Sequence, residues 1–118
     1  MKVLDLPAGP LLDRLIAEKV LGRPYRQPTG FEAQYEGAKP WCPSTSRDQS
    51  WELLREITER GGEWRLSYTT SGSDRPLCEA TVCVGNGVRH AWTVVAETLP
   101  LAICQAALAA HVGAEVEV

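Results

Sequence analysis

Two nearly continuous apolar stretches, residues 77–84 and 88–96, place the strongest constraint on how this chain folds. They flank the Gly-Asn-Gly sequence at 85–87, which favours a tight turn and therefore a two-stranded hairpin. A strand with one wet face alternates between apolar and polar residues, whereas these two stretches carry few polar residues on either face. We therefore expect other parts of the protein to cover both faces of these strands.

The remaining periodicities predict one more strand and three helices. Residues 63–70 alternate between apolar and polar side chains, as in a half-buried strand. Apolar residues recur at helical spacing over 10–21 and 47–60, and residues 98–112 are rich in alanine and leucine with Thr98 as a cap. The predicted fold class is α+β, a helix–sheet–helix (α/β/α) sandwich with a three-stranded antiparallel meander in the order α-α-β-β-β-α.

The third predicted strand poses a problem of pairing. In a simple meander it lies at the sheet edge, yet its sequence is typical of a buried strand. Either residues 1–6, the long loop or another subunit then pairs with it. The acidic tail at 114–118 is expected to fray.

Size and composition limit the function classes. A chain of 118 residues, with 44% hydrophobic and 23% charged residues, is expected to form a single globular domain over 1–118. It has no apolar run long enough to span a membrane, and its first residues do not resemble a signal peptide, so the host cell cytosol is the expected location and reduced thiols are expected. The net charge is −3 without a basic stripe, which disfavours binding to duplex nucleic acid.

A long segment without periodicity, residues 22–47, separates the first two helices. It contains four prolines and half of the eight aromatic residues, namely Tyr25, Phe31, Tyr35 and Trp41. Disordered linkers are poor in aromatics, and long loops in compact domains are usually functional. We therefore expect an ordered loop whose rings either cover the core or contact a ligand.

The end of this loop has the features of an anion site. Ser44-Thr45-Ser46 offers hydroxyl groups and backbone N–H groups at a helix start, where phosphate or carboxylate is favoured. Arginines would add charge, and aromatic rings could stack on a base. The simpler alternative is that the hydroxyls only cap the helix. The predicted ligand-binding residues are Tyr25, Arg26, Trp41, Ser44, Thr45, Ser46 and Arg47.

Three stretches in the same order resemble phage ABA sandwich domain proteins. Residues 12–22 are similar to the opening helix of that family, and 43–46 to its Pro-x-Tyr-Ser-Thr-Asp stretch, with Ser46 at the place of the aspartate. Residues 100–108 resemble the family's Ala-Ile-Cys-x-Ala-Ala-Leu final helix. The resemblance implies a small bacteriophage protein with an α/β/α sandwich, and it supplies no activity.

These features favour a non-enzymatic protein that binds a small anionic, nucleotide-like ligand, for instance to sequester a signal of the host's defence. A homo-oligomer would help to complete such a pocket. The alternative is an interaction or structural protein that binds a host or phage partner through the loop and the sheet edge. A small enzyme using Cys42 or His90 ranks last, and neither a metal nor a cofactor is expected, because no catalytic or ligating spacing is visible.

Overall fold

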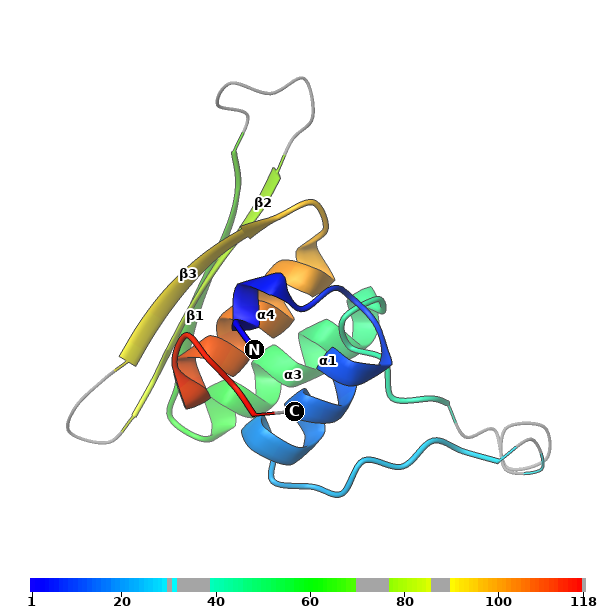
Figure 1. Cartoon of the computed structure of the whole chain (residues 1–118). Coiled ribbons are helices and arrows are strands. Elements are labelled where there is room, and N and C mark those ends of the chain that lie inside the picture. The colour runs from blue at the N-terminus through cyan, green and yellow to red at the C-terminus, as the bar shows by residue number, and fades with distance from the viewer. Residues whose placement is uncertain (30, 32–38, 70–76, 86–89, 118) are drawn as a thin grey trace.

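The computed structural model describes residues 1–29, 31, 39–69, 77–85 and 90–117 (Figure 1). The predicted turn residues 86–87, residues 88–89 of the third predicted strand, Thr70 and Tyr35 lie outside them. The described elements, in chain order, are η1 (Val3–Asp5), α1 (Pro10–Leu15), the π-helical η2 (Ile16–Val20), α3 (Arg47–Glu59), β1 (Glu63–Thr69), β2 (Leu77–Val84), β3 (His90–Ala96) and α4 (Leu99–Val112). The α+β class and the order α-α-β-β-β-α are confirmed, and α1 with η2 forms the first predicted helix.

The helix starts follow the local sequence signals. The Ser46 hydroxyl accepts a hydrogen bond from the Gln49 backbone N–H at 3.3 Å and caps α3. In the same way Thr98 accepts from the Leu101 N–H at 3.4 Å and caps α4, with Pro100 in the first turn. These two predicted caps are confirmed.

The sheet is a three-stranded antiparallel meander in the order β1-β2-β3. Leu66 pairs with Ala80, and Ala80 pairs with Val94, so these three residues share one face of the sheet. Ala80 and Val94 are buried and Leu66 is half-buried, which identifies this as the face that packs on the helices.

Helix α4 is the middle layer of the molecule. It contacts β2 and β3 on one side and α1, η2 and α3 on the other (Figure 1). Its buried residues run around the helix, because both sides are covered. They are Leu99, Ala102, Ile103, Cys104, Gln105, Ala106, Ala107, Leu108, Ala109 and Ala110. The small alanine side chains let the layers approach closely.

The expectation that other parts of the protein cover both faces of β2 and β3 is wrong for the described residues. The helices lie on one side of the sheet in Figure 1, and on the opposite face Thr93 and Val95 are exposed, while Glu79 and Thr81 are half-buried. Apolar β-branched residues such as Val95 suit a strand even where they face water. Their presence in β2 and β3 is therefore not a reliable sign that both faces of the sheet are buried. Strand β3 is one of the two edges of the described sheet, and residues 1–6 do not pair with it.

The two ends of the chain instead pair with each other. Lys2 forms an antiparallel bridge with Glu115, and the Val116 N–H donates to the Met1 carbonyl at 2.9 Å. Val116 is buried, so the prediction of a frayed tail is wrong for residues 114–117, and residue 118 lies outside the described residues. The buried Gln105 side chain fixes the neighbouring segment by donating to the Leu6 carbonyl at 2.7 Å.

Candidate functional site

The two arms of the long loop are joined by one glutamine. The Trp41 N–H donates to Gln27 Oε1 at 3.2 Å, and Gln27 Nε2 donates to the Trp41 carbonyl at 3.0 Å. Gln27 Nε2 also donates to the Tyr25 hydroxyl. These contacts join the two described arms of the loop, 22–29 and 39–46.

A surface cavity of about 150 Å³ lies between this loop and the end of the first helix. We call it the aromatic groove, and its lining residues are Ala17, Leu21, Arg23, Pro24, Tyr25, Arg26 and Trp41. The structure therefore brings together three of the predicted site residues, Tyr25, Arg26 and Trp41. Sequence reasoning missed the floor formed by Ala17 and Leu21, whose spacing of four places them on one helix face.

Trp41 has two roles at this groove. Its ring packs against the hydrophobic core, as the core-cover interpretation predicts, and it also lines the groove. Its indole Nε1 is buried and has no hydrogen-bond partner among the described residues. Buried donors are usually satisfied, so this N–H is an exception within the described residues.

Ser44 lies apart from the groove and is buried. Its backbone N–H donates to Asp13 Oδ1 at 2.9 Å, and its hydroxyl accepts from the Gly9 N–H at 2.9 Å. The carboxylate at the Ser44 amide thus belongs to the chain itself. Burial raises the pKa of Asp13 above 3.8, and the hydrogen bonds from Ser44 oppose that rise.

The other predicted residues at the start of α3 also serve local structure. The Thr45 hydroxyl and the Ser46 N–H both donate to the Cys42 carbonyl, at 3.3 and 2.9 Å. Arg47 is the first residue of α3 and is exposed. None of Thr45, Ser46 and Arg47 is among the described residues that line the aromatic groove.

Replacing Ser46 by alanine is expected to lower the free energy of unfolding by about 1 kcal/mol, because the Gln49 N–H loses its cap. Urea denaturation measures this change. Thr45→Ala is the matched control, since the Thr45 hydroxyl bonds only within its own turn and is exposed. Equal losses in the two variants would contradict the capping role.

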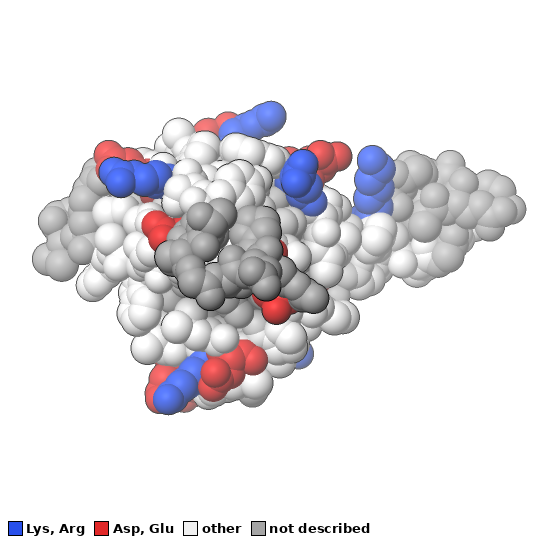
Figure 2. Space-filling model, turned by 90° about the horizontal axis from the view of Figure 1, so that it is seen from above, with Lys and Arg blue, Asp and Glu red and all other residues white. Residues whose placement is uncertain are grey.

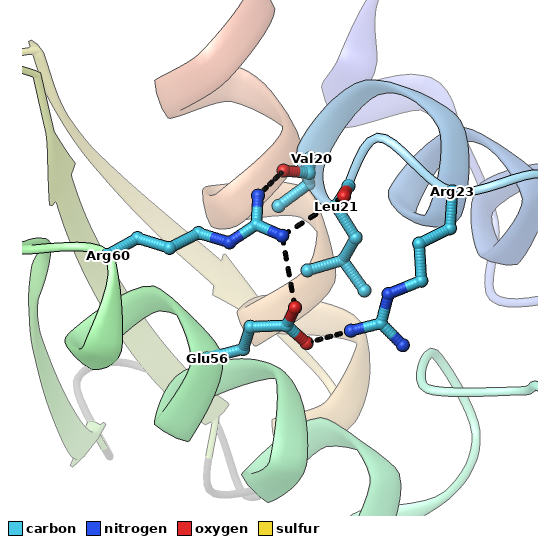
Figure 3. A network of polar contacts seen from close by, with 5 residues as sticks. All are labelled: Val20, Leu21, Arg23, Glu56 and Arg60. Atoms are coloured by element: carbon cyan, nitrogen blue, oxygen red, sulfur yellow. Dashed lines mark hydrogen bonds and ion pairs between the residues drawn. The ribbon is translucent and has the colours of Figure 1, made fainter.

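Glu56 contacts two arginines, of which Arg23 lines the aromatic groove (Figure 3). It contacts Arg23 through one carboxylate oxygen and Arg60 through the other, the latter at 3.0 Å. The hydrogen bond from Arg23 holds the pKa of Glu56 below 4.5, against the opposing effect of burial, and the charges of Arg23 and Arg60 add to the lowering. Arg23 is thereby fixed at the groove rim.

Other candidate chemistry has little support in the described parts of the chain. The four cysteines are free thiols, and burial raises the pKa of Cys104 well above its ordinary value, with the nearby Asp13 charge adding to the rise. No group of three or more His, Cys, Asp or Glu residues within the described ranges could hold a metal ion. Cys42, the thiol of the enzyme alternative, is half-buried and contacts the Pro40 carbonyl.

The surface charges and helix lengths add two observations. Figure 2 shows basic and acidic side chains interspersed on the described part of the face in view. Among the described helices, none combines the length and the apolar composition needed to cross a bilayer.

Comparison with known proteins identifies one family. The family model of the phage ABA sandwich domain matches residues 14–108, which include the described lining residues of the aromatic groove and the first ten residues of α4. No curated protein and no solved structure matches the chain significantly. Since the match covers most of the sequence and agrees with the order of the elements, the chain belongs to the phage ABA sandwich domain family.

Proposed function

We propose that this phage protein binds a small anionic, nucleotide-like ligand in the aromatic groove without transforming it. The observation that carries the proposal is that the rings of Tyr25 and Trp41 line the same groove as Arg23 and Arg26. A flat aromatic base stacks on such rings, and phosphate oxygens accept charge-assisted hydrogen bonds from guanidinium groups.

The size of the groove indicates which part of the ligand it takes. Its volume of about 150 Å³ is below the range of about 300–1,000 Å³ typical of pockets that enclose a whole ligand. We infer that the groove holds one ring, while the phosphate groups lie at the rim with the arginines. A second copy of the chain would then be needed to enclose the rest, in line with the expected homo-oligomer.

Binding alone is enough for the biological role that we propose. A protein that removes a nucleotide signal of the host's defence acts by mass action in the host cytosol, and it needs affinity and abundance rather than turnover. The groove supplies aromatic rings for stacking and arginine cations.

The experiment is a thermal-shift titration of the full chain with AMP, GMP and cyclic di-AMP, with adenosine as the uncharged probe. A nucleotide at about 100 times its Kd should stabilise the protein by about 2.7 kcal/mol. Trp41→Ala is expected to weaken binding about tenfold or more, because stacking contributes about 1–3 kcal/mol per base. Arg26→Gln should weaken nucleotide binding while leaving adenosine binding nearly unchanged.

The matched control is Trp51→Ala. Trp51 is 43% exposed on α3, packs edge-on against Trp64 with centroids 5.6 Å apart, and does not line the groove. Nucleotide binding should survive this change. The proposal fails if no nucleotide shifts the melting temperature at millimolar concentration, or if both tryptophan variants lose binding equally.

The alternative function, binding of a protein partner, is favoured by one observation. Strand β3 is an edge strand among the described strands and exposes Val95 to 48% beside an uncovered sheet face. Unprotected edges of this kind can accept another strand. Capture of one stoichiometric partner, lost in Val95→Lys and retained in Trp41→Ala, would favour this alternative over the nucleotide proposal.

A further inference from the structure

We propose a second binding site, for a small organic anion with an apolar body, in a pocket where the ends of η2, α3 and α4 meet the β2–β3 end of the sheet. We call it the helix-end pocket. Its described lining residues are Val20, Leu21, Ile57, Arg60, Gly62, Val84, Gly85, His90, Ala110 and His111. Its volume of about 310 Å³ lies at the lower end of the range for small-molecule pockets. Leu21 is the only described residue that it shares with the aromatic groove.

The walls of the pocket are apolar and belong to the core. Val20, Leu21, Ile57 and Ala110 are all buried members of the core, and Val84 packs against it. Such walls are rigid, since their side chains are fixed by packing on the layers behind them. They favour an aromatic or branched aliphatic group in the interior of the pocket.

Arg60 provides a positioned cation at this pocket (Figure 3). Its Nη1 donates to the Val20 carbonyl at 3.2 Å, and its Nη2 donates to the Leu21 carbonyl at 3.1 Å and to Glu56 at 3.0 Å. These bonds fix the guanidinium before any ligand arrives, so little side-chain entropy is lost on binding. They leave the Nε–H and one Nη1 hydrogen of Arg60 without a partner among the described residues.

The charge balance around Arg60 favours an anion. Carbonyl groups at helix C-termini carry partial negative charge and would repel a bound anion. Here Arg60 covers the Val20 and Leu21 carbonyls, while the backbone N–H groups of Gly62 and Gly113 donate to those of Ile57 and Ala109. Glu56 is shared between two arginines, so this cluster keeps a net positive charge.

Two histidines complete the polar part of the pocket. Nδ1 of His111 lies 2.7 Å from the Ala107 carbonyl, so Nδ1 carries the proton, and Nε2 of the neutral ring is an acceptor for a donor group of the ligand. His90 at the start of β3 is the other imidazole. No carboxylate is among the described lining residues. The Arg60 guanidinium over an apolar floor matches a carboxylate or phosphate on a short apolar skeleton.

The test uses three probes of one shape and different charge: benzoate, benzamide and benzamidine. Titration of the ¹⁵N-labelled full chain is followed by the amide signals of Gly62, Ala110 and His111. We expect benzoate to shift these signals with an affinity about tenfold higher than that of benzamide, because a charge-assisted hydrogen bond replaces a neutral one. Benzamidine should cause no shift there. The indole signal of Trp41 reports separately on the aromatic groove.

Arg60→Gln should weaken benzoate binding about tenfold. Arg55 is an exposed arginine on α3 outside the pocket, so Arg55→Gln should leave benzoate binding unchanged. The charge series on the unaltered protein remains decisive if Arg60→Gln does not fold. Equal binding of benzoate and benzamidine, or shifts confined to the Trp41 side, would overturn the proposal. The helix-end pocket and the aromatic groove are monitored by different NMR signals. Failure of the benzoate proposal therefore leaves the nucleotide proposal intact, and failure of the nucleotide proposal leaves the benzoate proposal intact.

Discussion

Replacing Ile103 by alanine is expected to lower the free energy of unfolding by about 2–5 kcal/mol. Ile103 is fully buried on α4, the helix that is enclosed between the sheet and the other helices. Truncation therefore removes contacts and leaves a cavity that two rigid layers cannot easily close. Urea denaturation, monitored by circular dichroism, measures the change.

The control for this prediction is Val95→Ala on the outer face of β3. Val95 is 48% exposed, so its truncation should change the free energy of unfolding by only a few tenths of a kcal/mol. If the sheet rather than α4 were the covered middle layer, Val95→Ala would be costly as well. A loss in Val95→Ala that approaches that of Ile103→Ala would therefore contradict the layer order.

The layer order shows what the sequence could and could not predict. The strands, the helices and their caps follow from local periodicity and capping residues, and their order agrees with the structure. Sequence analysis assigned the doubly covered position to the apolar strands, whereas α4 occupies it. The signal was present in residues 99–112, where only Gln105 and His111 are polar. An apolar helix without a polar face is buried on all sides, and this rule outweighs the apolar character of a β-branched strand.

Of the candidate site, the sequence predicted only the part that follows from the aromatic content of the loop at 22–47. The aromatic-rich loop suggested that Tyr25 and Trp41 pack on the core or on a ligand. The two arms of the loop that carry them are joined by the side chain of Gln27, and no sequence pattern marks Gln27 for this role. The residues at the start of α3 have the composition of an anion site, yet Ser44 bonds to Asp13, which lies 31 residues earlier in the chain. Hydroxyl-rich helix starts are equally suited to ligands and to the chain's own groups, and long-range packing decides between them.

Replacing Asp13 by alanine is expected to lower the free energy of unfolding by about 1–3 kcal/mol at neutral pH, because the buried N–H of Ser44 loses its acceptor. Asp13 is only 2% exposed, so water cannot easily take the place of the carboxylate. Asp13→Asn keeps an oxygen acceptor and removes the charge, and it should lose less stability than Asp13→Ala.

The pH dependence of stability separates the charge of Asp13 from its hydrogen bond. Because burial raises its pKa in the folded state, the folded protein holds this proton more tightly than the unfolded chain does. The original protein should therefore lose stability relative to Asp13→Asn as the pH rises from 3.8 through the raised pKa, and the difference should then become constant. Glu56, whose pKa is lowered, acts in the opposite direction, but it is present in both proteins and cancels in the comparison. A difference that stays flat across this pH range would show that the carboxylate at Ser44 carries no burial cost, and unchanged stability of Asp13→Ala would show that it does not hold the loop.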